Sequence, residues 1–429
     1  MGKGLRWKWI VAVWLLCSVA VSAQTADDRA LMLMREGDGL VLNRLLTVRA
    51  DSLSEGVRAL GTAFIRGCQG DAKQGAKLMK RALRRYQGLL NEALVARLTF
   101  GMALQQHRNG RDRKAAKTLS RYAEKHGSFA MRPTFERYGQ LFRACRPYRK
   151  VRMNTREAVV PFRIDSVGPQ NARSVAVRIP AIVNGVAVDM MLDTGATLNI
   201  LSQSMAEQLG VDMLDAEVFL DGMGENRGRM AVAKLLRMGN LEMRNVLFCV
   251  MDNNHEVGNH AETAHLNAIL GLPIMEQLGC VQLDFRSKTL RSATDIPLDE
   301  ANMSCGFAEN GLQVEVRHHE NRLSLIPDMG ATHSAVDIRS FAIQPDYITR
   351  NYPSREVVFV GWGGSVSGKE YLYPQFDVVV GSTVVSLPQL SILEGTDYDS
   401  RLGMDFFTRC ERVTFRLRYP AGLSVIPCR

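Results

Sequence analysis

A six-residue pattern that occurs twice constrains this chain more than any other feature of its sequence. Leu192-Asp193-Thr194-Gly195-Ala196-Thr197 returns as Pro327-Asp328-Met329-Gly330-Ala331-Thr332, an offset of 135 residues between Asp193 and Asp328. Each copy follows an apolar run, so a duplicated fold would bring the two aspartates together. Paired carboxyl groups can share one proton, and one of them then acts as a base while the other acts as an acid.

Further landmarks recur in the same order after each aspartate. Ser202 corresponds to Asp337 at the same offset, and both residue types favour the N-terminus of a helix. Three later pairs of segments also match: Asp221-Gly222-Met223-Gly224 with Val360-Gly361-Trp362-Gly363-Gly364, 268–275 with 400–407, and 280–285 with 410–415. Ordered recurrence of this kind indicates an internal duplication.

The block from about Val159 to the C-terminus resembles the retropepsin-like aspartic proteases of the clan AA type, with two lobes fused in one chain. In the first lobe the resemblance rests on Asp193-Thr194-Gly195-Ala196 with Ile269-Leu270-Gly271, and in the second on Asp328-Met329-Gly330-Ala331 with Leu402-Gly403. It implies a bilobal acid protease β fold, with lobe 1 at 159–300 and lobe 2 at 305–429.

The resemblance also implies a function, an aspartic endopeptidase in which Asp193 and Asp328 activate a water molecule for peptide hydrolysis. No metal and no cofactor is implied. The implied substrate is a peptide or protein in extended conformation. The active-site loops would be Thr194, Gly195, Ala196, Thr197, Met329, Gly330, Ala331 and Thr332, and the flap or substrate-binding residues Gly222, Met223, Gly224, Gly361, Trp362 and Gly363.

Physical reasons support several of these assignments. A glycine two residues after each aspartate permits close backbone approach, and the Thr194 hydroxyl can form a hydrogen bond across the axis between the lobes. Gly271 and Gly403 would let a neighbouring strand pass tightly against these loops.

The second lobe departs from the family pattern at three positions. Met329 lacks the hydroxyl that Thr194 has, Pro327 lacks a backbone donor, and Arg401 stands where an apolar residue is usual. The sequence therefore leaves an alternative open, a catalytically inactive peptide-binding protein with the same fold. In a third possibility the N-terminal helices carry the function and the β region is a scaffold.

Residues 24–150 show helical spacing of apolar residues. Two segments resemble each other, 59–78 and 99–119, each containing a polar turn with a glycine, Gly70-Asp71 and Gly110-Arg111. The pattern resembles a tetratricopeptide-like repeat, and a generic helical bundle fits about equally well. This region could bind a protein partner.

The N-terminus predicts export. Residues 1–23 have the basic, apolar and small-residue order of a signal peptide, so we expect a periplasmic or extracellular protein without a transmembrane segment. The net charge of +10 is concentrated between Arg108 and Arg156. A solvated basic face explains it better than acidic partners or anionic lipids, and we expect no nucleic-acid binding.

Turn signals predict two hairpins. Asn184-Gly185 is a strong two-residue hairpin signal. Tyr419-Pro420-Ala421-Gly422 lies midway between Cys410 and Cys428, so these two cysteines could face each other across the last two strands and form a disulfide.

Overall fold

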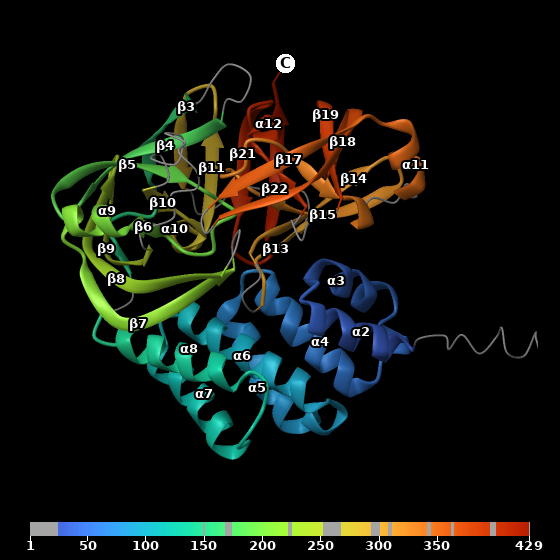
Figure 1. Cartoon of the computed structure of the whole chain (residues 1–429). Coiled ribbons are helices and arrows are strands. Elements are labelled where there is room, and N and C mark those ends of the chain that lie inside the picture. Colours follow the sequence, from blue (N-terminus) through green and yellow to red (C-terminus); the bar gives the residue numbers. More distant parts are fainter. Residues whose placement is uncertain are drawn as a thin grey trace, which may run out of the picture.

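A computed structural model describes residues 25–148, 151–167, 174–221, 225–251, 267–292, 301–307, 311–340, 345–361, 364–394 and 400–428. The expected signal peptide at 1–23 lies outside these residues. A helical region is followed by a two-lobed β region (Figure 1), which confirms the fold class predicted from the sequence. Within the described ranges, no helix is long and apolar enough to cross a membrane.

The helical region packs each helix from α4 to α8 against the next one along the chain. Its elements are α2 (Ala26–Glu36), α3 (Gly39–Val48), η1 (Ala50–Ser52), α4 (Glu55–Cys68), α5 (Ala72–Tyr86), η2 (Gln87–Leu89), α6 (Glu92–Arg108), α7 (Asp112–Lys125) and α8 (Arg132–Cys145). The predicted turns separate α4 from α5 and α6 from α7, with φ of 87° at Gly70 and 65° at Gly110. The helical prediction is confirmed, while the tetratricopeptide-like class stays a prediction.

Lobe 1 is built on one sheet, in which β10 lies between β5 and β6 next to the first aspartate loop. The predicted Asn184-Gly185 hairpin joins β4 to β5, with φ of 49° and 93° at its two residues, as a type I′ turn requires. The elements are β1 (Arg152–Met153), β3 (Arg163–Val167), β4 (Ser174–Val183), β5 (Val186–Leu192), β6 (Ile200–Ser202), α9 (Gln203–Leu209), β7 (Asp212–Asp221), β8 (Glu225–Met238), β9 (Leu241–Met251), β10 (Ala268–Leu270) and α10 (Leu272–Leu278).

Lobe 2 repeats this arrangement. β20 pairs in parallel with β15 as β10 does with β5, and β16 pairs in parallel with β19 as β6 does with β9. The elements are β13 (Met303–Ser304), β14 (Gln313–His318), β15 (Asn321–Pro327), β16 (Ala335–Asp337), η4 (Ile338–Ser340), α11 (Pro345–Asn351), β17 (Ser354–Gly361), β18 (Gly364–Val380), β19 (Thr383–Glu394), β20 (Arg401–Leu402) and α12 (Met404–Phe407). The duplication predicted from the sequence is therefore present in the fold.

A third sheet joins the two lobes. Its strands run in the order β2 (Val159–Pro161), β12 (Thr289–Ser292), β11 (Cys280–Asp284), β21 (Cys410–Arg416) and β22 (Gly422–Pro427). β11 and β21 are the two segments that the sequence matched to each other, and they pair antiparallel with Leu283 opposite Val413. One apolar core extends through this sheet into both lobes.

The suggested Cys410–Cys428 disulfide is wrong. Both cysteines are free, Cys410 buried and Cys428 exposed. The expected register holds from Arg416 opposite Gly422 to Arg412 opposite Ile426, and a bulge then places Cys410 opposite Pro427. One extra residue in the bulged strand is enough to move the two cysteines out of register.

The segment that follows β13, near the start of lobe 2, is anchored in the helical region. The Phe307 ring stacks on Phe64 with centroids 4.8 Å apart, and a Cβ at Gly67 or Gly101 would lie 2.6 or 2.4 Å from that ring. Gln105 donates to the carbonyl of Phe307 at 3.0 Å. We call Cys305–Phe307, with the groove between α4 and α6 that receives it, the linker anchor.

The helical region also shares an apolar cluster with lobe 1. Phe135 and Phe142 of α8 belong to it, together with Leu214 and Val218 of β7 and Ile269 of β10. In Figure 1, α8 lies beside β7 at the boundary between the helices and lobe 1. The helices therefore support the hairpin of β7 and β8, whose tip residues 222–224 lie outside the described part of the chain.

Candidate active site

The first aspartate begins the loop that follows β5. Its backbone N–H donates to the carbonyl of Leu270 on β10 at 3.0 Å, which ties the start of the loop to that strand. The side chain then turns back over its own loop, because Oδ1 of Asp193 accepts the amides of Gly195 at 2.8 Å and Ala196 at 3.1 Å. Two amides thus fix the direction of this carboxyl group.

The second aspartate loop repeats these bonds. The N–H of Asp328 donates to Leu402 on β20 at 2.8 Å. Oδ1 of Asp328 accepts the amides of Gly330 at 2.9 Å and Ala331 at 3.2 Å. Both carboxyl groups are therefore oriented by the same backbone geometry.

The glycines of the two loops bring the carboxyl groups together. A Cβ at Gly195 would lie 2.6 Å from Cγ of Asp328, and a Cβ at Gly330 would lie 2.5 Å from Cγ of Asp193. Each carboxyl group thus packs against the glycine of the opposite loop, where no side chain fits. The arrangement places Asp193 and Asp328 in one site, in hydrogen-bond contact with each other.

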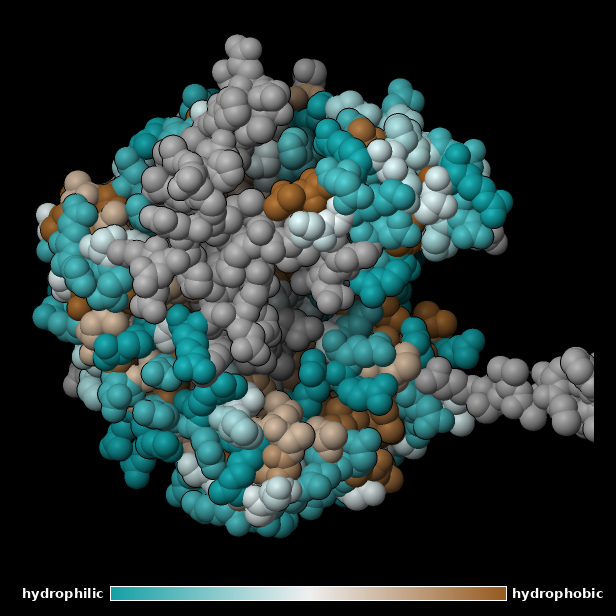
Figure 2. Space-filling model, in the orientation of Figure 1, coloured by the Kyte–Doolittle hydropathy of each residue, from teal (hydrophilic) through white to brown (hydrophobic). Residues whose placement is uncertain are grey.

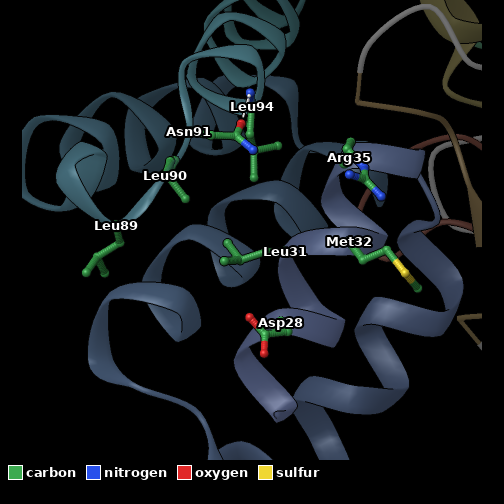
Figure 3. Close-up of a pocket in the computed structure, with 8 residues that line it drawn as sticks. All are labelled: Asp28, Leu31, Met32, Arg35, Leu89, Leu90, Asn91 and Leu94. Atoms are coloured by element: carbon green, nitrogen blue, oxygen red, sulfur yellow. Dashed lines mark hydrogen bonds between the residues drawn. The ribbon is translucent and has the colours of Figure 1, made fainter. Parts of the chain in front are cut away.

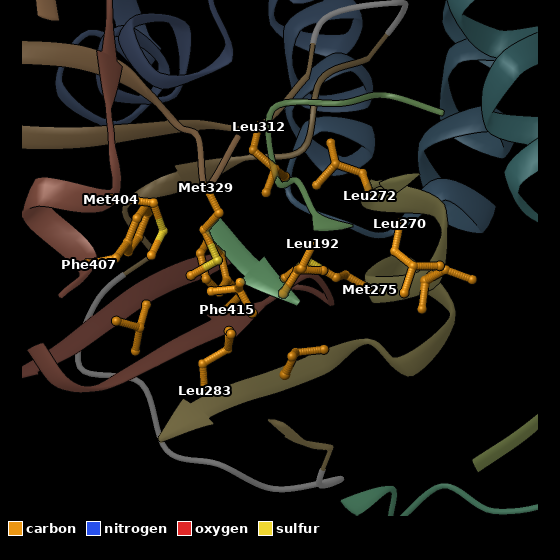
Figure 4. Packing of buried hydrophobic residues seen from close by; sticks show 14 of the residues in the cluster. Leu192, Leu270, Leu272, Met275, Leu283, Leu312, Met329, Met404, Phe407 and Phe415 are labelled. Carbon is orange, nitrogen blue, oxygen red and sulfur yellow. The ribbon is translucent and has the colours of Figure 1, made fainter. Parts of the chain in front are cut away.

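The cross-axis hydroxyl bond is present on one side only. Thr194 Oγ1 donates to the carbonyl of Pro327 and accepts from the N–H of Met329, the latter at 2.9 Å. Met329 returns no such bond, and its fully buried side chain lies in the core. Figure 4 shows it between Leu192 on one side and Met404 with Phe407 on the other.

Pro327 does not weaken the strand that leads to Asp328. The N–H groups of Ile326 and Asp328 make the bonds from β15 to β20, to Ser400 at 2.9 Å and to Leu402 at 2.8 Å. Pro327 lies between these two donors, at a position where the parallel pairing requires no N–H donor to β20.

The expected close passage of Gly271 and Gly403 is confirmed. A Cβ at Gly271 would lie 2.6 Å from the carbonyl oxygen of Ala196, and one at Gly403 would lie 2.9 Å from that of Ala331.

Two polar side chains accept hydrogen bonds from these glycine N–H groups, and neither residue was predicted from the sequence. Asn199 Oδ1 accepts the N–H of Gly271 at 3.0 Å, and Ser334 Oγ accepts that of Gly403 at 2.9 Å. Both residues stand six positions after their aspartate, so the 135-residue offset could have revealed them.

Arg401 contacts the second aspartate directly. Its Nη1 donates to Asp328 Oδ2 at 2.6 Å, with the Arg401 side chain 18% and the Asp328 side chain 6% exposed. The sequence marked Arg401 as a departure from the family pattern but did not predict this ion pair.

The pKa of Asp193 is raised above the ordinary value for aspartate. Burial is the largest cause, and the charge of Asp328 and the hydrogen bond between the carboxyl groups act in the same direction. The amides of Gly195 and Ala196 oppose this shift more weakly. Asp193 therefore keeps a proton at a pH where an isolated aspartate would be ionised, as general acid chemistry requires.

The other predicted loop residues lie around the two aspartates. Thr197 is exposed, and the carbonyl of Thr332 accepts the N–H of Asp405 on α12 at 3.1 Å. The carbonyls of Ala196 and Ala331 accept the N–H groups of Leu272 and Met404.

The bases of both expected flap hairpins are formed. Asp221 pairs with Glu225 between β7 and β8, and Gly361 pairs with Gly364 between β17 and β18. The tip predictions Gly222, Met223, Gly224, Trp362 and Gly363 fall on residues outside the described ranges. In the part of the chain that is described, no three His, Cys, Asp or Glu residues are grouped as metal ligands.

A cavity of about 320 Å³ lies elsewhere, in the helical region. Four leucines and Met32 form most of its lining, and Asn91 caps α6 by accepting the N–H of Leu94 at 2.9 Å (Figure 3). Figure 2 shows brown and tan residues gathered towards the bottom of the view, over the helices. This cavity lacks paired carboxyl groups and is separate from the aspartate site.

Comparisons with known proteins agree with this geometry for lobe 1. A family model described as aspartyl protease matches residues 179–274, which include the Asp193 loop and Gly271. No curated protein matches the sequence. With its two equivalent lobes, the chain has a retropepsin-like aspartic protease fold preceded by a helical region.

Among solved structures, the chain is similar to a retropepsin-like aspartic protease from Rickettsia conorii, at 20% identity over 33% of this chain and 92% of that one, with a TM-score of 0.22. Basic 7S globulin from soybean is 10% identical over 64% of this chain and 95% of its own, with a TM-score of 0.39. Conglutin gamma from lupine seeds is 12% identical over 63% and 95%, with a TM-score of 0.38.

Proposed function

We propose that this protein is an exported aspartic endopeptidase in which Asp193 and Asp328 activate a water molecule. The observation that carries the proposal is the mutual packing of each aspartate carboxyl group against the glycine of the opposite loop. Ordinary turn aspartates have no reason to approach each other from segments 135 residues apart. Burial, together with the neighbouring Asp328, raises the pKa of Asp193, so this dyad member keeps a proton at a pH where an isolated aspartate is ionised.

This protonation state supports acid–base hydrolysis. One carboxylate takes a proton from water, whose oxygen attacks the scissile carbonyl carbon, while the protonated partner donates its proton to the carbonyl oxygen. The tetrahedral intermediate then collapses, the C–N bond breaks, and a proton passes to the leaving amine. In this proposal the β7–β8 and β17–β18 hairpins, whose strands are paired as far as Asp221 with Glu225 and Gly361 with Gly364, act as flaps that cover an extended peptide.

The test is cleavage of a peptide library at several pH values by the wild type, Asp193→Asn and Asp328→Asn. We expect both substitutions to abolish cleavage, while Asp346→Asn on exposed α11 serves as the matched control and retains it. Cleavage that survives Asp328→Asn would instead indicate that two first lobes pair in a homodimer. A second measurement concerns export, for which we expect N-terminal sequencing of the exported protein to begin at Gln24.

A second candidate function is peptide binding without cleavage. Met329 favours it, because the second loop lacks the hydroxyl that would complete the cross-axis bonding. A wild type that binds library peptides at every pH tested and cleaves none would establish this alternative. The helical region would then be the site where a protein partner or the bound chain is recruited.

A further inference from the structure

Equivalent strands beside the two aspartate loops carry different side chains at one position. Ile269 of β10 lies opposite Met191, and Arg401 of β20 lies opposite Ile326, in the same parallel register. Ile269 is buried in the apolar cluster of lobe 1. Lobe 2 thus replaces a hydrocarbon side chain by a permanent cation next to its aspartate.

The cation makes the hydrogen bonding of the two aspartates unequal. Asp328 accepts two amides on Oδ1 and the Arg401 guanidinium on Oδ2. Asp193 accepts two amides on Oδ1 and shares a hydrogen bond with Asp328. Three donors stabilise an ionised Asp328. The hydrogen bond between the two carboxyl groups is therefore most favourable when a protonated Asp193 donates it to Asp328.

Few other charged groups near this loop can compete with Arg401. Asp193 faces Asp328 from the opposite loop. Among the described residues of the second loop and α12, His333 is exposed, and Asp405 Oδ1 accepts the hydroxyl of Ser334 at 2.7 Å. The ion pair at 2.6 Å is therefore the strongest source of asymmetry at the dyad.

Building on the proposed function, we propose that Arg401 is a positioning residue that fixes the single proton of the dyad on Asp193. Ionised Asp328 is then the general base and Asp193 the general acid. An ionised carboxylate offers about four acceptor sites on its two oxygens. The two amides, the Arg401 guanidinium and the proton supplied by Asp193 account for all four of them.

Arg401→Met and Arg401→Lys test this role through the pH dependence of kcat/KM. An opposite charge at contact lowers a carboxyl pKa by about 1–3 units, so removing it should move the acid limb of the profile to higher pH by about one unit or more. Lysine keeps the charge and should hold the limb near its wild-type position. An unmoved limb in Arg401→Met, or an equal shift in Arg401→Lys, would overturn the inference.

Arg339→Met is the matched control, because Arg339 pairs with Asp337 at 2.6 Å in the same lobe and its side chain is 71% exposed. Its pH profile should equal that of the wild type. If Arg401→Met does not fold, as judged by thermal unfolding, Arg401→Gln replaces it and removes the charge while keeping a polar side chain.

A measurement without substrate separates this inference from the proposed function. In ¹³C NMR titration of aspartate-labelled protein, Asp193→Asn identifies the Asp193 resonance, and Arg401→Met should lower its raised apparent pKa, because the dyad proton is then no longer fixed on Asp193. If that shift occurs and the wild type cleaves no peptide, the proposed function fails and the proton placement stands. If the wild type cleaves peptides and the resonance does not move, the proton placement fails.

Discussion

The two aspartate loops share one backbone frame and differ in the side chains that complete it. Both loops bond to the following apolar strand and turn two amides onto their aspartate. Lobe 1 adds the Thr194 hydroxyl across the axis, whereas lobe 2 adds a buried Met329 and the Arg401 cation. A duplicated fold can therefore keep a symmetric backbone while each lobe contributes a different side-chain function.

The largest expected effect tests the symmetric part of this comparison. Gly195→Ala and Gly330→Ala would each place a Cβ within 2.6 Å of the opposite carboxyl group. Because a displacement of about 1 Å in a catalytic group can cost 100-fold, each substitution should lower kcat/KM by about 100-fold or more. Gly88→Ala, which meets nothing within 4 Å, is the control. If only one of the two loop substitutions lowered kcat/KM, the two loops would not contribute equally to the active site.

Thr194 is expected to matter more for stability than any residue of the second loop. Thr194→Val leaves the buried carbonyl of Pro327 and the N–H of Met329 without partners, at about 1–3 kcal/mol for each group. Urea unfolding should show this loss, and Thr194→Ser should restore most of the free energy of unfolding. Thr197→Val, at an exposed position of the same loop, should change it by less than about 0.5 kcal/mol. If Thr194→Val and Thr197→Val lowered the free energy of unfolding equally, the cross-axis role of Thr194 would be contradicted.

Met329→Thr sharpens the comparison by giving the second loop a hydroxyl. Met329 is fully buried in the apolar core, so the lost burial should destabilise the protein by about 2 kcal/mol or more. Met329→Leu conserves the volume and should cost less than about 1.5 kcal/mol. A gain in both stability and cleavage for Met329→Thr would mean that the second loop retains an intact site for the hydroxyl.

The smallest effect expected is a change in how stability depends on pH. The pKa of Asp193 is raised in the folded protein, so its contribution is fully present below the unfolded value of about 4 and is lost as the pH rises through the folded value. Asp193→Asn cannot ionise. The Tm of Asp193→Asn should therefore rise relative to the wild-type Tm as the pH increases from acid to neutral. A Tm difference that stays constant with pH would contradict the raised pKa of Asp193.

The sequence predicted the parts of the site that depend on order and spacing. The 135-residue offset led from Asp193 to Asp328, and the apolar-glycine segments lie against the two loops as expected. Each of these features is a local pattern that occurs once in each lobe, so the copy in one lobe supports the interpretation of the copy in the other.

Features that depend on side-chain direction or on register could not be predicted. β20 has only two residues, too few for alternation to reveal which way Arg401 points. The bulge between Cys410 and Arg412 changes the register without any glycine or proline in the bulged strand to mark it. The linker anchor has no periodicity, so nothing in the sequence tied Phe307 to helices about 200 residues earlier.

The linker anchor has a consequence for the order in which the regions of this protein fold. Domains generally fold as units, with the N-terminal one first, so we expect the groove between α4 and α6 to form before Phe307 docks in it. Once Phe307 docks there, with Gln105 holding its backbone carbonyl, lobe 2 begins to fold from a point already fixed beside lobe 1. We therefore expect the helical region to act as an assembly template for the second half of the active site.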